Sequence, residues 1–283
     1  MKARKAMFAG SWYPGNASEC EREIKEFIKD GKTKTPAGTK LSGGIVPHAG
    51  WYYSGKIACN VIKILSEAET PDVLLVFGMH LHPGSPRYLM KEGLWETPFG
   101  NIEIEEKVAA ELAEKYSFEI ETAQRFNRDN TIELQLPFIK YFFKNVKIVP
   151  MGLPPVEESL KIGQEAVKIA KNSGLKVMVL GSTDLTHYGI NYGFVSHGTG
   201  PQAVKWVKNE NDKRVIDAML EMDPGKVIKE ALANDNACCA GAAATAISAA
   251  KELGASRAEL VAYTTSYDIS PADSFVGYAG IVF

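Results

Sequence analysis

The chain has 283 residues, 45% of them hydrophobic, and a formal net charge of −2. This length and composition allow a large buried core, and the balanced charge argues against nucleic acid or anionic lipid as a partner. No stretch approaches the roughly 18–20 apolar residues of a membrane helix, and the basic N-terminus lacks the apolar segment of a secretory signal. We therefore expect a cytoplasmic protein that does not associate with membranes.

The first half of the chain alternates between helical and strand patterns. Apolar residues at helical spacing predict an amphipathic helix that begins at Ser18 as its N-cap and ends at Gly31. The run 73–77 is apolar throughout, which is typical of a strand buried on both faces of a sheet. The other predicted elements are a strand within 41–50 and helices over 56–68 and 104–116.

The second half continues this alternation. Residues 131–143 fit either a helix or a strand. A strongly amphipathic helix is predicted to close at Gly174, which takes the position after its C-cap. The remaining predictions are strands within 146–153, 176–189, 258–268 and 274–283, the last of them antiparallel, and helices near 201–221, 223–233 and 240–253.

This order of elements predicts an α/β fold. We expect a single-domain α/β/α sandwich over residues 1–283, with a mostly parallel central sheet. No linker-like composition, block of like charges or internal repeat divides the sequence.

Histidines follow the predicted buried strands. His48 comes after the first strand, His80 and His82 after the second, and Asp184 and His187 after a later one. Because the carboxyl ends of parallel strands meet at one edge of a sheet, we expect these side chains to converge there. Neutral imidazoles, together with a carboxylate or a thiolate, form a site for iron, copper or zinc.

A pair of cysteines near the end of the chain supplies a possible sulfur ligand. Cys238 and Cys239 precede a run of glycine and alanine that reads as the start of a helix. A thiol at a helix N-terminus loses its proton more readily, so it binds metal or reacts more easily. The alternative is that both are small core residues beside a tight helix contact. We expect all cysteines to be reduced, since their spacing fits no disulfide framework.

Two further segments contain candidate site residues. Asp129, Asn130 and Glu133 precede an apolar stretch and fit either a helix cap or a polar shell that orients a histidine ligand. Trp12 and Tyr13 fit either an aromatic anchor for the N-terminus or a pocket wall. The aromatic residues that follow His48, among them Trp51 and Tyr53, would form the rest of that wall.

Together these motifs resemble the Memo family, whose archaeal and bacterial members are labelled AmmeMemoRadiSam system protein B. The resemblance spans nearly the whole chain. It implies a fold similar to the LigB subunit of class III extradiol dioxygenases, which are non-haem iron enzymes that open aromatic rings. The matching segments are AGSWYPG, IVPHAGWYYSG, VFGMHLHPGSP, NTIELQLPF, GSTDLTHYG and ACCAGAAATAI, in this order.

The resemblance also implies a metal site. It assigns one ligand to His48, and, with one deletion in the loop, a second to His80 with His82 as the rival. The third is a late cysteine, where the spacing of the motif favours Cys238 over Cys239.

Other residues carry over as neighbours of this implied metal. The resemblance implies that Asp184 and His187 are polar groups that orient a metal ligand or act as acid and base. Asn130 stands where the family commonly has a histidine, whereas Glu133 is kept. The element CCAGA also departs from the pattern of the family.

The expected function is therefore a metal-dependent oxidoreductase that uses iron or copper, with zinc as a further possibility, on an unknown small or macromolecular substrate. The alternative is a non-catalytic module that holds a peptide or partner protein in the same cleft. Gene association within the family implies a radical-SAM protein and an AMMECR-type protein as partners.

Overall fold

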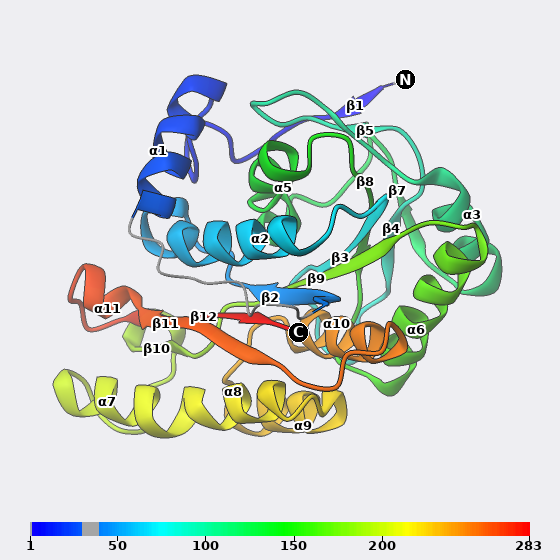
Figure 1. Ribbon diagram of the computed structural model, residues 1–283. Helices are drawn as coiled ribbons and strands as arrows, with labels where there is room; N and C mark the ends of the chain where they lie inside the picture. The colour runs from blue at the N-terminus through cyan, green and yellow to red at the C-terminus, as the bar shows by residue number, and fades with distance from the viewer. Residues whose placement is uncertain (1, 30–39) are drawn as a thin grey trace.

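The computed structural model describes residues 2–29 and 40–283. In this part of the chain, nine strands form one sheet in the order β10-β12-β2-β9-β3-β8-β4-β7, and β11 pairs with β12 on a branch (Figure 1). The strands are β2 (Gly43–Val46), β3 (Val73–Gly78), β4 (Tyr88–Met90), β7 (Glu119–Glu121), β8 (Lys147–Gly152), β9 (Val177–Ser182), β10 (His187–Tyr188), β11 (Glu259–Thr265) and β12 (Phe275–Val282).

The centre of this sheet is parallel. Strands β2, β9, β3 and β8 pair in parallel, and their residues are almost all buried. Such burial on both faces explains their uninterrupted apolar sequences. Strand β12 runs antiparallel to β2, and β4 runs antiparallel to β8. The predicted α/β fold with a mostly parallel sheet and an antiparallel last strand is confirmed.

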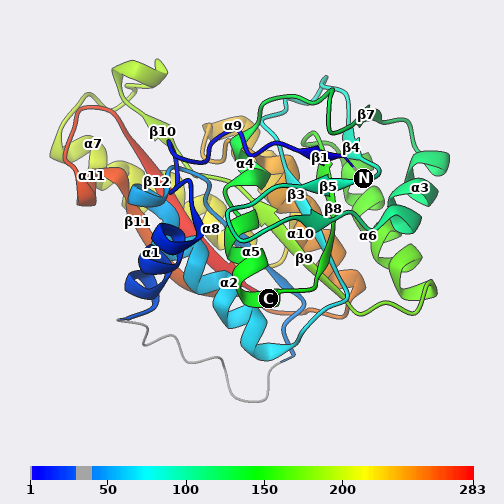
Figure 2. The ribbon, with the colours of Figure 1, turned by 90° about the horizontal axis from the view of Figure 1, so that it is seen from above.

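Helices cover both faces of the sheet. In Figure 1, α1, α2 and α5 lie above it, and α6, α8, α9 and α10 lie below; Figure 2 shows the upper layer from above. The helices are α1 (Ala17–Lys29), α2 (Lys56–Ala68), α3 (Glu106–Lys115), α4 (Asn130–Glu133), α5 (Leu136–Phe143), α6 (Glu157–Asn172), α7 (Pro201–Trp206), α8 (Asp212–Leu220), α9 (Pro224–Asn234), α10 (Ala240–Glu252) and α11 (Ser266–Ile269).

The lower layer is packed tightly through small residues. A Cβ on Gly181 of β9 would lie 2.8 Å from the Cβ of Ala246, and one on Gly163 of α6 would lie 2.5 Å from a methyl carbon of Thr245. These approaches explain the run of alanines in α10, because larger side chains would push the helix away from the sheet. The start of α10, where Cys238 and Cys239 lie, is thereby held against the sheet edge.

Several local predictions can be compared with the structure. Helix α1 begins at Ala17 rather than Ser18, because the side chain of Asn16 accepts a hydrogen bond from Glu19 N (3.0 Å) and caps the helix. The predicted end at Gly31 lies outside the described residues. Residues 131–143, for which helix and strand were both open, are helical in α4 and α5. Gly174 does follow the end of α6 with a positive φ of 76°.

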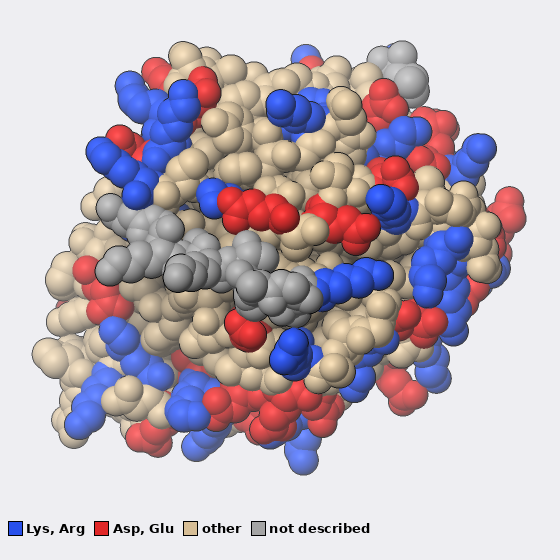
Figure 3. Space-filling model, in the orientation of Figure 1, with Lys and Arg blue, Asp and Glu red and all other residues tan. Residues whose placement is uncertain are grey.

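Two smaller features complete the fold. A second sheet joins β1 (Ala3–Arg4), β5 (Leu94–Trp95) and β6 (Ile102–Glu103), where Arg4 forms a buried ion pair with Glu121. On the face in Figure 3, basic and acidic side chains are interspersed, as the balanced charge leads one to expect. Among the described residues, every helix is too short or too polar to cross a bilayer.

Candidate metal centre

The carboxyl ends of three neighbouring strands lie level with one another. In the parallel register, Val46 of β2 pairs with Ser182 of β9, and Phe77 of β3 pairs with Gly181 of β9. His48, His80 and Asp184 each stand two residues beyond the end of their strand. This shared offset brings the three side chains to one edge of the sheet.

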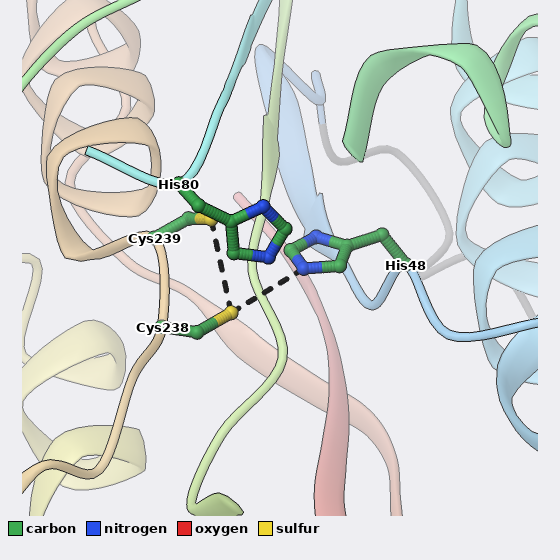
Figure 4. Close-up of side chains that lie close together, drawn as sticks. All are labelled: His48, His80, Cys238 and Cys239. Atoms are coloured by element: carbon green, nitrogen blue, oxygen red, sulfur yellow. Dashed lines mark hydrogen bonds between the residues drawn. The ribbon is translucent and has the colours of Figure 1, made fainter. Parts of the chain in front are cut away.

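Four potential metal ligands converge at this edge. One nitrogen each from His48 and His80 and the sulfur atoms of Cys238 and Cys239 all lie within 4.8 Å of one another. Figure 4 shows the two imidazoles and the two thiols pointing into a common space. The spatial convergence of strand-end histidines with the late cysteines is therefore present in the structure.

His48 is held in a fixed orientation. Its Nδ1 lies 3.0 Å from the hydroxyl of Ser182, and that hydroxyl donates its proton to Thr131 O at 2.8 Å. Ser182 must therefore accept from His48, so Nδ1 carries a proton and Nε2 faces Cys238 Sγ at 3.3 Å. The backbone N–H of His48 donates to Asp184 Oδ1 at 2.7 Å. A hydrogen bond that fixes one ring nitrogen and frees the other is typical of metal-binding histidines.

His80 is positioned by a backbone turn and a carboxylate. The preceding residue, Met79, has a φ of 72°, and its N–H donates to Thr131 Oγ1 at 2.7 Å. This left-handed conformation is unfavourable for a side chain of that size and reverses the chain directly after β3. The Nδ1 of His80 lies 3.4 Å from Asp129 Oδ2, and the other oxygen of this carboxylate, Oδ1, caps α4. His80 thus has a carboxylate partner, whereas His48 has a hydroxyl.

The charge state of the two histidines reflects these partners. Burial lowers the pKa of His80, but hydrogen bonds with Asp129 and Cys238 outweigh that effect and raise the pKa to about 10. Burial likewise lowers the pKa of His48, and attraction to Asp184 and Cys238 more than compensates, so that the pKa is raised. A metal ion would displace these ring protons from the interior of the cluster.

The two cysteines are bound to the loop after β9. Cys238 N donates to Asp184 O at 3.1 Å, and Cys239 N donates to Thr183 Oγ1 at 3.0 Å. Burial raises the pKa of both thiols, but hydrogen bonding with Cys239 and the nearby His48 lowers the pKa of Cys238 well below its usual value. The pKa of Cys239 is raised further by its neighbour. Cys238 is therefore the more acidic thiol of the pair.

Two of the distances within the cluster are close to those between ligands of one metal ion. With metal–sulfur and metal–nitrogen bonds near 2.3 and 2.0–2.1 Å, tetrahedral coordination places two sulfurs about 3.8 Å apart and a sulfur and a nitrogen about 3.5 Å apart. The sulfurs of Cys238 and Cys239 are 3.7 Å apart, and Cys238 Sγ is 3.3 Å from His48 Nε2. A soft thiolate with two imidazoles suits copper, zinc or iron.

Asp184 and His187 lie beside this cluster. Asp184 Oδ2 is 3.9 Å from His48 Nε2 and 3.9 Å from His187 Nε2. The Nε2 of His187 is buried and has no hydrogen-bond partner, and its ring lies against Tyr192 with centroids 5.0 Å apart. Both side chains are thus next to the potential ligands without belonging to them.

Two clefts reach the cluster from different sides. The lining of the first, of about 580 Å³, includes His48 and His80, and that of the second, of about 530 Å³, includes Cys238. Among the described residues, His187 and Tyr192 line both clefts. The first cleft is also lined by Trp12, Tyr53, Asn130 and Asp184, and the second by His82, Leu185, Phe194 and Leu232.

Other candidate residues lie around the cluster without reaching it. His82 lies outside the group of four, and its Nδ1 accepts from Gly84 N at 3.1 Å. Asn130, which lines the first cleft, donates to His48 O at 2.9 Å and so supports the ligand loop. Glu133 is buried and accepts from the N–H of Phe8 (2.7 Å) and the hydroxyl of Tyr13 (3.1 Å).

The four aromatic candidates fall into a buried pair and an exposed pair. Tyr13 and Trp51 are buried, and Trp51 stacks on Phe138 with ring centroids 4.1 Å apart. Both residues border a shallow neighbouring groove rather than the cleft at His48. Their position is that of an anchor which holds the N-terminal segment on the core, and Trp12 and Tyr53 are the exposed members of the set.

Most of the hydroxyl groups that support the cluster are not evident from the sequence pattern. Ser182 orients His48, Thr183 holds the backbone of Cys239, and Thr131 binds the loops after both β3 and β9. Two of these hydroxyls could have been predicted, because Ser182 and Thr183 lie at the end of a strand that the sequence indicates is buried. In the sequence, Cys238 and Cys239 were alternatives for one sulfur ligand, whereas the sulfur atoms of both lie in the cluster.

Comparison with known proteins agrees with this architecture. A chain of Escherichia coli K12, described as an uncharacterized protein, has a similar fold, with a TM-score of 0.54 at 10% identity over 86% of this chain and 99% of the other. A MEMO1 family protein of Pyrococcus furiosus is 34% identical, covering 99% of this chain and 98% of the relative. One of Pyrobaculum aerophilum is 31% identical, covering 100% and 99%. The family described as Memo-like protein matches residues 4–282, and the chain therefore belongs to the Memo family.

Proposed function

We propose that this protein is a metal-dependent oxidoreductase with a single redox-active metal ion held by His48, His80 and Cys238. The observation that carries the proposal is the convergence of these three donors with Cys239 at the end of the sheet. Each imidazole has its Nδ1 engaged by a fixed partner, so that its other nitrogen points toward the Cys238 sulfur. Preorganised donors of this kind lower the cost of binding a metal.

Copper fits this donor set best, with iron as the alternative. Two imidazoles and one thiolate are the ligands of mononuclear copper sites, and soft sulfur disfavours hard oxygen-seeking ions such as magnesium. A bound copper or iron ion would supply one-electron chemistry. Cys239, the thiol with the raised pKa, would influence how strongly the sulfur of Cys238 binds the metal, because the two sulfur atoms are 3.7 Å apart.

Asp184 and His187 have the positions of acid/base groups. The imidazole of His187 borders both clefts, and its unpartnered Nε2 is 3.9 Å from the Asp184 carboxylate. A substrate in either cleft would lie within reach of this ring. Asp184 would orient the ring and hold the backbone of His48.

Metal loading and oxygen uptake test this function. The purified protein is loaded without oxygen with Cu(I) or Fe(II), and bound metal and oxygen consumption are measured with catechols and thiols as reductants. We expect one metal ion per chain and uptake that His48→Ala abolishes. His197→Ala is the matched control, because His197 is an exposed histidine away from the cluster. Equal metal binding by His48→Ala and the parent protein would contradict the proposal.

A second candidate is a non-catalytic module that holds a ligand in the same cleft. The supporting observation is the row of exposed aromatic side chains around the first cleft, where Trp12 and Tyr52 extend into solvent. Exposed aromatics are frequent anchors for partners. Tight ligand binding without oxygen uptake by any metal form would favour this module.

A further inference from the structure

The two cysteines of the cluster are neighbours both in the sequence and in space. Cys238 and Cys239 are free thiols, and their sulfur atoms lie 3.7 Å apart. Figure 4 shows the two sulfur atoms facing each other. Successive side chains of an extended segment point to opposite sides. The approach of the two sulfurs is therefore a property of the turn that leads into α10, for which Cys239 is the N-cap.

The backbone of this turn is fixed by its neighbours. Cys238 N donates to Asp184 O at 3.1 Å, and Cys239 N donates to Thr183 Oγ1 at 3.0 Å. At the start of α10, a Cβ on Gly241 would lie 2.2 Å from a backbone oxygen, so the helix packs directly against another segment. A disulfide bond of about 2.0 Å between the two sulfurs would therefore form by rotation of the side chains.

The two thiols differ in their access to solvent. Cys238 lines the second cleft, whereas Cys239 is 1% exposed and is absent from the described linings of both clefts. The described lining of the second cleft contains no lysine or arginine, and Asp235 is its one carboxylate. A small uncharged compound can therefore enter this cleft without meeting an unfavourable charge, and it reaches the sulfur of Cys238 first.

We propose that Cys238 and Cys239 form a reversible oxidation site, at which a small disulfide compound in the second cleft closes a disulfide bond between the two residues. The sulfur of Cys238 attacks the compound, forms a mixed disulfide and releases one half of the compound as a thiol. Cys239 then attacks the sulfur of Cys238, which closes the bond in the protein and releases the other half. The protein loses two electrons and two protons, and the two released thiols carry them away.

The adjacency of the two residues makes this oxidation reversible. Consecutive Cα atoms are about 3.8 Å apart across a trans peptide, which is shorter than the roughly 4.4–6.8 Å that disulfides prefer. The bond is thus strained, and strained disulfides are readily reduced by other thiols. In the oxidised state Cys238 has no thiolate to offer to a metal. This regulation of the metal site rests on the proposed function, whereas formation of the bond does not.

Oxidation of the full metal-free chain tests the proposal. The protein is incubated without oxygen with bis(2-hydroxyethyl) disulfide, an uncharged reagent, and the mass of the protein and the released thiols are measured. We expect the chain to lose two hydrogen atoms and to release two reagent thiols, with the bond located by peptide mapping at residues 238–239. Absence of reaction, a reagent half that stays attached to the parent protein, or a bond between two chains would overturn the proposal.

Serine substitutions separate the roles of the two thiols. Cys239→Ser removes the second thiol, so Cys238 should keep one half of the reagent attached. Cys238→Ser should slow the reaction at least about tenfold, because the remaining thiol is buried. Cys20→Ser is the matched control, since serine keeps the hydrogen bond from this buried position to Pro14 O, and it should close the bond as the parent does. Equal rates in Cys238→Ser and the parent would assign the reaction to another thiol and refute the proposal.

Copper binding is then measured on the reduced and oxidised forms after the small molecules are removed. The oxidised form should bind Cu(I) more than about 100-fold more weakly, because the loss of a ligand outweighs the loss of a supporting group, and treatment with dithiothreitol should restore the affinity. Unchanged affinity after oxidation would refute the regulation. A bond that forms while neither form binds copper would support the oxidation site and refute the proposed metal function. Copper binding that depends on His48, without formation of the bond, would give the opposite result.

Discussion

The structure contains two buried polar clusters that differ in an instructive way. The first is the candidate metal centre around His48 and Cys238. The second lies behind it, where the carboxylate of Asp212 accepts from Thr186 N (3.0 Å), Thr186 Oγ1 (2.5 Å) and Tyr263 Oη (2.7 Å). Burial raises the pKa of Asp212 to about 6, and hydrogen bonds with Thr186 and Tyr263 oppose that rise.

The two clusters differ in whether their polar groups already have hydrogen-bond partners within the protein. A Cβ on Gly277 would lie 2.0 Å from Asp212 Oδ2, so the backbone closes over this carboxylate. In the metal centre, sulfur and nitrogen atoms face one another beside two clefts. A shifted pKa is therefore insufficient to mark a functional site. Convergent donors with access from a cleft are the more specific sign.

The largest expected effect concerns the two cysteines. Cys238→Ala removes the thiolate and should lower copper affinity by more than about 100-fold, whereas Cys239→Ala should lower it about tenfold, as the loss of a supporting group does. Competition with a chromogenic copper chelator measures both. Equal losses in the two variants would show that both sulfurs are ligands of equal weight.

The second cluster should respond in stability rather than in metal binding. Asp212→Ala leaves its buried hydrogen-bond donors without an acceptor and should lower the free energy of unfolding by about 3 kcal/mol. Asp217→Ala is the matched control on the same helix, because its exposed ion pair with Lys213 contributes little. Urea denaturation gives the stability, and copper affinity should stay unchanged. A loss of copper affinity in Asp212→Ala would show that the two clusters are energetically coupled and would contradict this prediction.

A smaller effect is expected for the partner of His80. Asp129→Asn keeps the shape of the side chain but removes the charge that orients the imidazole, and it should weaken copper binding by about 10- to 100-fold. Ser182→Ala tests the neutral partner of His48 in the same assay and should fall at the lower end of that range. If neither substitution alters copper affinity, Asp129 and Ser182 do not orient the two imidazoles for metal binding.

The last predicted effect is a pH dependence. The pKa of Asp212 is raised above its unfolded value of 3.8, so the folded state holds this proton more tightly between about pH 4 and 6. The resulting stabilisation is complete below the unfolded pKa and is lost as the pH rises through about 6, with a slope of at most ~1.4 kcal/mol per pH unit. The stability of the parent protein relative to Asp212→Asn should therefore decline over this window. A flat difference curve, measured by denaturation at each pH, would contradict the assignment.

Much of the fold follows from the sequence, because uninterrupted apolar runs such as those of β3 and β9 are typical of strands buried on both faces of a sheet. The same runs locate His48, His80 and Asp184 at strand ends, and the parallel register brings them together. The periodicity of the sequence does not reveal how a hydroxyl such as Ser182 is shared between two loops. That role depends on Thr131, which is 51 residues away in the chain.

Local chemistry was the harder part to predict. The cap of α1 lies at Asn16 instead of Ser18, and both residue types serve equally well at that position. Trp51 and Tyr53 are two residues apart, yet one is stacked in the core and the other faces the cleft. The π-helical turn at η1 (Trp51–Gly55) breaks the ordinary helical spacing, so sequence periodicity does not tell which ring is buried.

The presence of two clefts that share His187 and Tyr192 has a consequence for the binding of inhibitors. A compound that fills the cleft at His48 leaves Cys238 approachable through the other cleft, so two inhibitors of different shape could occupy the protein together. Such compounds would not exclude each other, and a single compound would have to reach both clefts to close both routes.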